Sequence, residues 1–187
     1  VEIRDTNDGR TSYSYDGNGN LLTVTDAKHQ VTTFAYDSRN RLLSTTDPLG
    51  KSETYTYDGN DNLTTRHTPK GDDILFAYDP VNQLLSKTLP GSQITSYAYD
   101  LVGNLTNVTD PDSVLAMSYD QADRLLSVKT DGSPNQPAVT LSSSYDQNGN
   151  RVSLTDPVQA TNFGYDALNR LTGFTQPSTP ATTLPTL

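Results

Sequence analysis

The chain of 187 residues contains no cysteine, which excludes a disulfide framework, a thiolate metal site and a thiol nucleophile. Positive charge is also scarce: 13 Lys and Arg stand against 22 Asp and Glu, giving a net charge of −9. Nucleic acids and anionic membranes bind clustered Lys and Arg, so we expect no nucleic-acid partner. No stretch approaches the roughly 20 apolar residues of a membrane span, so we expect no membrane insertion.

Hydrophobic residues make up only 33% of the chain, a level that together with its net charge is typical of disorder. The aromatic residues, however, keep a regular phase. Eight Tyr-Asp dipeptides recur, with spacings of 21, 21, 21, 21, 20, 26 and 20 residues: Tyr15-Asp16, Tyr36-Asp37, Tyr57-Asp58, Tyr78-Asp79, Tyr99-Asp100, Tyr119-Asp120, Tyr145-Asp146 and Tyr165-Asp166. A fixed period of this length predicts an array of one small structural unit.

One repeat is predicted to be a β-hairpin. Asp37 to Asn40 is polar turn sequence, and residues 41–46 are rich in leucine and β-branched residues, as in a short strand. Asp47-Pro48-Leu49-Gly50 suits a type I turn, and residues 51–57 alternate with the period of two that indicates a strand. The predicted fold is therefore all-β, with about eight antiparallel hairpins of 20–21 residues in a curved, spiralling sheet, part of a β-shell or solenoid.

The repeat tyrosines are predicted to belong to the scaffold and not to a catalytic site. The residue two positions before each repeat Tyr is large and apolar or aromatic in seven of eight cases: Tyr13, Phe34, Tyr55, Phe76, Tyr97, Met117 and Phe163, with Ser143 as the exception. A Leu follows five residues after seven of the eight Asp residues, with Arg151 as the exception. If these side chains form a buried core, Tyr78→Ala should cost about 3–5 kcal/mol.

The predicted domain organisation is one hairpin array over residues 1–176, a fragment of a longer array, followed by a Pro/Thr-rich linker or tail over residues 177–187. The array begins in mid-repeat, so residues 1–7 are expected to be half a hairpin whose partner strand lies in a preceding repeat. The 26-residue spacing is explained by a longer loop over residues 131–137.

Tyr-Asp, then Gly/Asn-Asn/Arg-Leu, then Asp-Pro-X-Gly at this period resembles the YD-repeat, or RHS-repeat, family. Residues 36–42 and 145–151 show it most clearly, and the resemblance covers nearly all of residues 1–176. It implies hairpins spiralling into a hollow shell, as in polymorphic-toxin shells that encapsulate C-terminal toxins, wall-associated proteins and teneurin-like adhesion receptors. The self-cleaving core segment of the family has no counterpart here, so the resemblance implies neither protease nor toxin activity.

Other candidate sites favour ordinary turn chemistry. Residues 16–20, 58–62 and 146–150 match the first half of a calcium loop, but the sixth and twelfth positions of that loop do not fit. Asp72-Asp73 is expected to be a solvated loop, and His29 and His67 are solitary. Three glycosylation sequons begin at Asn62, Asn104 and Asn107, and mean little in a bacterial protein. We expect no catalytic residue, cofactor or metal.

The sequence favours a non-catalytic structural module of a large secreted or cell-surface bacterial protein. Its expected partners are adjacent repeats of a longer parent chain and an encapsulated toxin or effector. Two alternatives stay open. Exposed Tyr and Asn on a curved sheet suit a carbohydrate-binding or adhesion module, and free strand edges suit a subunit of an extracellular filament that pairs with neighbouring copies.

Overall fold

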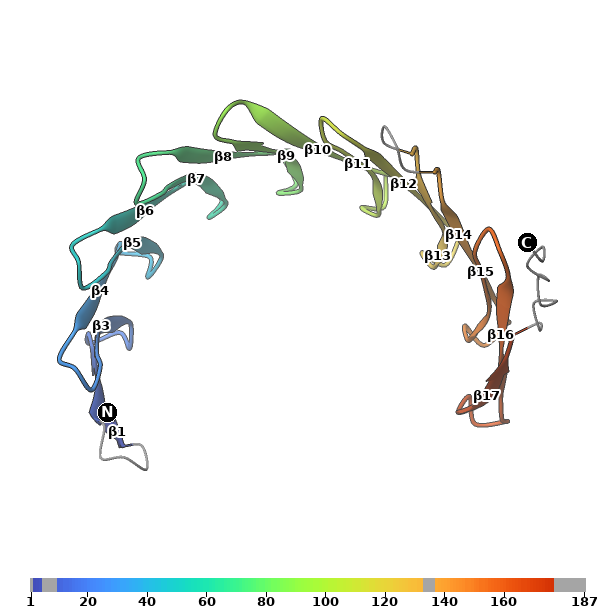
Figure 1. Ribbon diagram of the computed structural model, residues 1–187, viewed down its shortest axis with the longest axis horizontal. Helices are drawn as coiled ribbons and strands as arrows, with labels where there is room; N and C mark the ends of the chain where they lie inside the picture. Colours follow the sequence, from blue (N-terminus) through green and yellow to red (C-terminus); the bar gives the residue numbers. More distant parts are fainter. Residues whose placement is uncertain (1, 5–9, 133–136, 177–187) are drawn as a thin grey trace, which may run out of the picture. The chain divides into compact units, whose positions relative to one another are not determined.

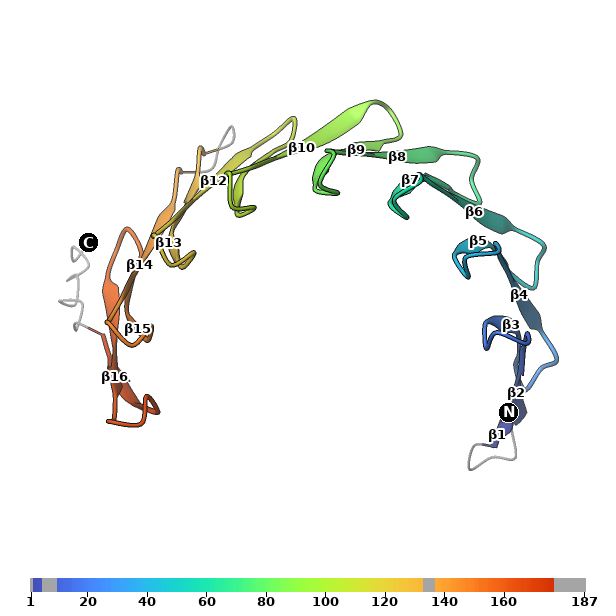
Figure 2. The same cartoon turned by 180° about the vertical axis from the view of Figure 1, so that it is seen from behind.

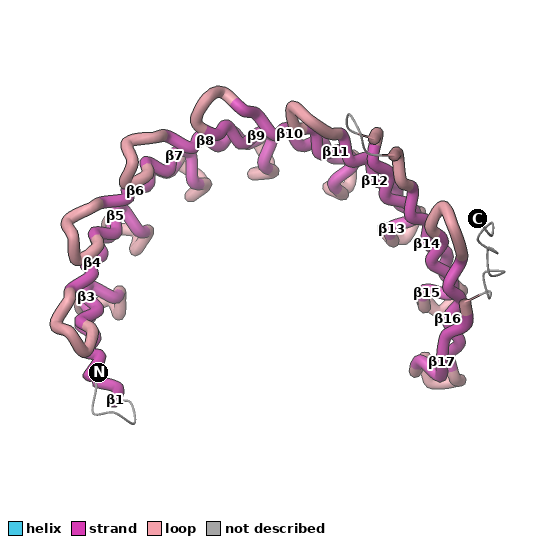
Figure 3. The backbone as a smooth tube through the Cα atoms, viewed as in Figure 1, coloured by secondary structure: helices cyan, strands magenta, loops and turns pink. Residues whose placement is uncertain are grey.

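The structure, a computed structural model, describes residues 2–4, 10–132 and 137–176. Its secondary structure is entirely β: these residues contain seventeen strands and no helix (Figures 1 and 3). In the described part of the chain, there is accordingly no helix of the length and apolarity that crossing a membrane requires. The predicted all-β class is confirmed.

The chain divides into two compact units, Val1–Ile94 and Thr95–Leu187, each of which is described by itself. The strands of the first unit are β1 (Glu2–Arg4), β2 (Arg10–Tyr15), β3 (Leu21–Thr25), β4 (Val31–Tyr36), β5 (Leu42–Thr46), β6 (Ser52–Tyr57), β7 (Leu63–His67), β8 (Asp73–Tyr78) and β9 (Leu84–Leu89). β10 (Gln93–Tyr99) runs across the division, and the second unit continues with β11 (Leu105–Thr109), β12 (Val114–Tyr119), β13 (Leu125–Thr130), β14 (Thr140–Tyr145), β15 (Arg151–Thr155), β16 (Ala160–Tyr165) and β17 (Leu171–Thr175).

Within each unit, every strand pairs antiparallel with the next strand in the chain, as β4 pairs with β5 and β5 with β6 (Figure 2). Within each unit, the Tyr-Asp turns therefore reverse the chain at one end of the strands, which we call the Tyr-Asp edge, and the turns between hairpins reverse it at the opposite end. The two strands predicted at residues 41–46 and 51–57 are β5 and β6, each beginning one residue later than expected. The hairpin prediction is confirmed.

The first strand pairs with the second, with Ile3 of β1 facing Thr11 of β2 and Arg4 facing Arg10. The prediction that the hairpin partner of residues 1–7 lies in a preceding repeat stays a prediction, because this contact joins two hairpins and is not one within a hairpin. This pairing repeats the one between β3 and β4, where Val24 faces Thr32. The described strands therefore number seventeen, one more than eight complete hairpins supply.

A β-bulge precedes every repeat tyrosine. In the β4–β5 hairpin, Ala35 faces Ser44 while Tyr36 faces Leu42, so Leu43 is the extra residue of the longer side. The same register shift occurs in each of the eight hairpins, and it increases the local right-handed twist. Because a bulge depends on pairing between strands, the alternation of residues within one strand did not reveal it.

Alternation gives the strands two unlike faces. On β4, Phe34 and Tyr36 are half-buried, whereas Thr33 and Ala35 point the other way and are exposed. The first set of positions, with the repeat tyrosines and the residues two before them, forms what we call the aromatic face. The second set is mostly Ser, Thr and Ala, and we call it the small-residue face.

The predicted buried core is wrong. None of the side chains in the described ranges is buried, and Tyr15 is 47% exposed and Phe174 65% exposed. Tyr78 is half-buried. The strands form one layer with nothing packed over the aromatic face of either unit in these residues, so each aromatic side chain contacts only its neighbours across the strands. Such cross-strand pairs contribute roughly 0.2–1 kcal/mol each, far less than a core aromatic.

Two predicted segments lie partly or wholly outside the described residues: the longer loop, whose residues 133–136 are not described, and the tail at 177–187. At the near side of the loop, Asp131 is tied to the start of β12. Its backbone N–H donates to the Val114 carbonyl at 3.0 Å, and the Val114 N–H donates to Asp131 Oδ1 at 2.9 Å.

Candidate functional site: the ladder of Tyr-Asp turns

The repeat Asp organises each Tyr-Asp turn. In the turn that begins at Asp37, carboxylate oxygen Oδ1 accepts the backbone N–H groups of Arg39 at 2.8 Å and Arg41 at 3.0 Å. The Asp37 backbone closes the turn, with its N–H donating to the Arg41 carbonyl and its own carbonyl accepting from Asn40, both at 3.0 Å. A side-chain oxygen that accepts from nearby backbone N–H groups is the reason Asp favours turns. The predicted role of Asp in the turn is confirmed.

We number the turn residues from this Asp, so that positions 3 and 4 lie three and four residues after it. Position 3 has a left-handed backbone with positive φ, which only Gly, Asn and Asp adopt readily. The residues there are Gly19 (88°), Asn40 (61°), Asp61 (71°), Asn82 (68°), Gly103 (100°), Asp123 (58°), Gly149 (87°) and Asn169 (60°). Local backbone geometry therefore favours these three residue types at position 3, although His29 adopts the same φ in the turn at Asp26.

Position 4 donates a side-chain N–H to the second carboxylate oxygen, Oδ2, of its own Asp. The pairs are Asn20–Asp16 (2.8 Å), Arg41–Asp37 (2.7 Å), Asn62–Asp58 (2.9 Å), Asn104–Asp100 (3.1 Å), Arg124–Asp120 (2.7 Å), Asn150–Asp146 (2.9 Å) and Arg170–Asp166 (2.8 Å). These side-chain donors hold the pKa of Asp16, Asp58 and Asp146 below its ordinary value of 3.8. Hydrogen bonds that favour the ionised form have this effect.

The same position 4 side chain also reaches the following Tyr-Asp turn. It donates to the position 3 side chain one repeat later in five pairs: Asn20–Asn40 (2.8 Å), Arg41–Asp61 (2.8 Å), Asn62–Asn82 (2.8 Å), Asn104–Asp123 (2.9 Å) and Asn150–Asn169 (2.9 Å). We call this row of side-chain contacts the turn ladder. It joins successive repeats at one edge of the strands in each unit.

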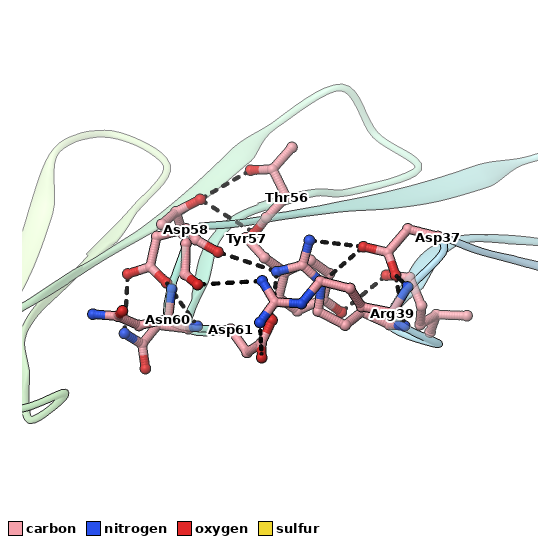
Figure 4. Close-up of polar contacts among 12 residues, drawn as sticks. Asp37, Arg39, Thr56, Tyr57, Asp58, Asn60 and Asp61 are labelled. Atoms are coloured by element: carbon pink, nitrogen blue, oxygen red, sulfur yellow. Dashed lines mark hydrogen bonds and ion pairs between the residues drawn. The ribbon is translucent and has the colours of Figure 1, made fainter.

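Arginine at position 4 adds a second contact with the next repeat. The Arg41 guanidinium lies 4.7 Å from the centre of the Tyr57 ring, and its Nη1 donates to the Asp58 carbonyl at 3.1 Å. Beside it, Arg39 pairs with the Asp61 carboxylate at 2.6 Å (Figure 4). The second unit repeats the arrangement, with Arg124 4.7 Å from the centre of the Tyr145 ring. Stacking of a cation on an aromatic ring stabilises by roughly 0.5–1 kcal/mol at exposed sites.

The repeat tyrosines are linked to the preceding repeat through their hydroxyl groups. Each of four donates to the carbonyl of the first residue of the strand before its own: Tyr57 to Leu42 (2.9 Å), Tyr119 to Leu105 (2.9 Å), Tyr145 to Leu125 (3.0 Å) and Tyr165 to Arg151 (3.1 Å). Partial burial raises the pKa of the Tyr57 hydroxyl. The Tyr-Asp dipeptide thus contacts the repeat before it through Tyr, while Asp organises the turn that contacts the repeat after it.

The calcium-loop matches have the geometry of ordinary turns. The Asp16 carboxylate accepts from the Asn18 and Asn20 backbones and from the Asn20 side chain. In the described ranges, no group of three or more His, Asp and Glu side chains is placed to hold a metal ion. The amide groups of the sequon residues Asn62 and Asn104 both belong to the turn ladder.

Two of the remaining expectations need correction. Asp73 is not part of a loop but the first residue of β8, and its carboxylate lies 2.7 Å from Nδ1 of His67 on β7, so His67 is not solitary. The register explains the pair, because His67 faces Asp73 directly.

Sequence reasoning also missed a polar cluster on the aromatic face, where Glu53 accepts from Arg66 and from the Tyr55 hydroxyl. The hydrogen bond from Arg66 lowers the pKa of Glu53.

The turn ladder was likewise missed, although the sequence carries a pattern that would have indicated it. Position 4 is Asn, Arg or Gln in all eight turns, and position 3 is Gly, Asn or Asp. Every position 4 side chain thus carries an N–H donor. At position 3, Asn and Asp offer an oxygen acceptor, and Gly has no side chain. Reading the repeats in parallel, one turn against the next, would have predicted the contact.

Comparison with protein families agrees with the repeat structure. Residues 1–31, 15–52, 36–73, 78–115 and 99–134 match the family model described as RHS Repeat, and together they cover more than half of the chain. The chain belongs to the RHS-repeat family. A comparison of this RHS-repeat chain with curated protein sequences gives no match.

Solved structures share the fold of this RHS-repeat chain. TcdB2-TccC3 without its hypervariable C-terminal region aligns with a TM-score of 0.69 at 20% identity over 87% of the chain. A Photorhabdus luminescens Tc holotoxin pore with a mutation in TccC3 aligns with a TM-score of 0.69 at 21% identity, also over 87%. In both cases the RHS-repeat chain spans only 10% of the length of the solved chain.

Proposed function

We propose that the chain is a non-catalytic structural module of a large secreted or cell-surface bacterial protein. Its RHS repeats build part of a β-shell or scaffold that encapsulates or presents a C-terminal toxin or effector. The turn ladder is the observation that carries this proposal, because it uses the most regular polar side chains of the repeats to join each repeat to the next. The shared fold with TcdB2-TccC3 supports it.

A non-catalytic role is supported by the surroundings of the polar groups. The repeat carboxylates are engaged by N–H donors of their own turns, as Asp37 is by Arg39 and Arg41.

The proposal assigns residues 1–176 to the array and residues 177–187 to a linker or tail. The eight Tyr-Asp dipeptides act as structural repeat residues, and the partners are adjacent repeats of a longer parent chain and the toxin or effector. The location is extracellular or at the cell surface.

A chimera of TcdB2-TccC3 tests the proposal. Residues 1–176 replace the segment of TcdB2-TccC3 that aligns with them, and electron microscopy shows whether the complex still assembles. We expect an assembled particle whose C-terminal region resists added protease as the parent complex does. An all-β chimera that fails to assemble, or that assembles with a protease-sensitive C-terminal region, contradicts the shell function while leaving the fold assignment intact.

Strand edges favour a second candidate, an extracellular filament subunit. β17 pairs with β16, and all five of its residues are exposed, including Phe174 on the aromatic face. Unpaired strand edges readily add another strand. Light scattering over a concentration series separates the candidates: growth with concentration favours strand-edge association of copies, and a constant mass favours the shell module. Carbohydrate binding stays a prediction, which a glycan-binding screen of the purified chain checks.

A further inference from the structure

The Tyr-Asp turns are of two kinds, which alternate along the chain. At position 4, a short Asn alternates without exception with a longer Arg or Gln: Asn20, Arg41, Asn62, Gln83, Asn104, Arg124, Asn150 and Arg170. We call the turns with Asn at position 4 short turns and the others long turns. In six of the eight repeats the aromatic face follows the same alternation, since Tyr13, Tyr55 and Tyr97 precede short turns, whereas Phe34, Phe76 and Phe163 precede long ones. Met117 and Ser143 are the exceptions.

Short turns are always followed by a side-chain acceptor. The four Asn side chains at position 4 meet Asn40, Asn82, Asp123 and Asn169, at 2.8 to 2.9 Å. An Asn amide lies close to its own backbone, so it reaches the next turn only where that turn extends a side chain toward it. Asn and Asp meet this need and also tolerate the positive φ of position 3.

Long turns do not need that side chain. Arg124 is followed by Gly149, and its Nη1 donates to the backbone carbonyl of Asp146 at 3.1 Å. A Cβ built at Gly149 would lie 4.0 Å from Arg124 Nη1, so the guanidinium passes directly beside this glycine. In the sequence, Gln83 is likewise followed by a glycine at position 3, Gly103. Gly103 and Gly149, the two position 3 glycines whose preceding Tyr-Asp turn is in this sequence, thus both follow a long donor.

We infer that positions 4 and 3 of successive Tyr-Asp turns form a length-matched code that determines which repeat can follow which. The building unit of the array is then a pair of repeats, 42 residues from Asp16 to Asp58, and not the single 21-residue hairpin. A pair contains four strands and so advances the array by about 19 Å. The order of the repeats would follow this code whatever the array encloses.

A mismatch and its repair test the code in the first unit. Asn40→Gly removes the acceptor that Asn20 needs, while the backbone at φ 61° suits glycine better than asparagine. Asn20→Arg in the same chain supplies a long donor, which recreates the combination of Arg124 at position 4 with Gly149 at position 3 of the next turn. The readout is hydrogen exchange of the backbone N–H groups of Arg39 and Arg41, which donate to Asp37 in the affected turn.

We expect Asn40→Gly to lower the protection of these two N–H groups and Asn20→Arg in the double variant to restore it, with a coupling of roughly tenfold between the two changes. Additive effects of the two substitutions would overturn the code. Local exchange is measurable even if global stability changes little, and Asn150→Arg with Asn169→Gly repeats the experiment in the second unit.

Asp61→Gly is the control, because position 3 also has positive φ there but follows the long Arg41. It is made in an Arg39→Ala background, since the ion pair between Arg39 and Asp61 has no counterpart at Gly149. Arg41 Nη1 already donates to the Asp58 carbonyl. Asp61→Gly therefore leaves Arg41 with the kind of backbone contact that Arg124 makes beside Gly149. We expect the backbone N–H groups of the turn that contains Asp61 to lose less protection against hydrogen exchange than those of the turn that contains Asn40 lose in Asn40→Gly. An equal or larger loss would show that length matching does not decide the contact.

Discussion

The turns at the two ends of the strands, which we call the two edges of the array, share their internal geometry and differ in what they contact. At the edge opposite the turn ladder, Asp47 Oδ1 accepts the backbone N–H groups of Leu49 and Lys51, both at 2.9 Å, and Gly50 has a φ of 78°. The turn at Asp37 has the same pattern. Each turn is therefore complete within five residues, whichever edge it occupies.

Among the described residues, the same side-chain contact recurs from one turn to the next only in the turn ladder. At the opposite edge, the described residues show no repeated side-chain pair from one turn to the next, although Asp131 is joined to Val114. This edge also varies more in sequence, with Thr68-Pro69 and Leu89-Pro90 in place of Asp-Pro, and it includes the long loop at 131–137. A turn that is satisfied locally tolerates substitution and insertion, whereas a ladder turn must also suit its neighbours.

Acid should have the largest effect, since it acts on many turns at once. Hydrogen bonds hold the pKa of Asp16, Asp58, Asp120 and Asp146 below 3.8. A carboxyl whose folded pKa is lowered contributes stability that is fully present well above pH 4 and is lost as the pH falls through the folded value. We expect the melting temperature to be constant from pH 7 to about 5 and to fall steeply below about pH 4. A flat profile down to pH 2 would contradict the role of these carboxylates.

Tyr57→Ala should have the next largest effect, because it removes aromatic packing, the stack under Arg41 and the hydrogen bond to the Leu42 carbonyl. From partial burial plus one hydrogen bond, we expect a loss of about 2 kcal/mol in the free energy of unfolding. Tyr57→Phe keeps the ring and should cost about 1 kcal/mol. Urea unfolding measures both, and Tyr15→Ala, at a ring already 47% exposed, is the control with a smaller expected loss.

Paired alanine substitutions compare the two edges directly. Asp37→Ala removes the turn acceptor and also releases Arg41 from its place in the ladder, whereas Asp47→Ala removes only the local turn acceptor. Thermal unfolding should therefore show a larger fall for Asp37→Ala. Equal falls would indicate that the ladder adds nothing to the stability that the turn itself provides.

Calcium removal should have no measurable effect. The carboxylates in the three loops that resemble calcium sites, at Asp16, Asp58 and Asp146, already accept N–H donors from their own turns. EDTA should leave the melting temperature unchanged. A fall of several degrees that calcium reverses would show that these loops bind the ion.

Much of the fold could be predicted from the sequence, because its determinants are local. Asp and a residue that tolerates positive φ define each turn, and a period of two places Phe34 and Tyr36 on one face. The bulge at Leu43, the pair His67–Asp73 and the contact of Arg41 with Tyr57 could not be predicted in the same way. Each depends on the register between strands, which no single repeat contains.

By itself, the sequence determined the period, the hairpins, the turn chemistry and the membership of the RHS-repeat family, since these follow from residue types at fixed spacing. Only the tertiary structure decided how the repeats meet. It showed that Tyr78 is half-buried and not part of a core, and that Asn20 reaches Asn40 across a full repeat. The physical reason is that burial and contacts between turns depend on neighbouring strands. In the described part of the chain, a side chain in this single layer contacts the adjacent strands, and no second layer covers it.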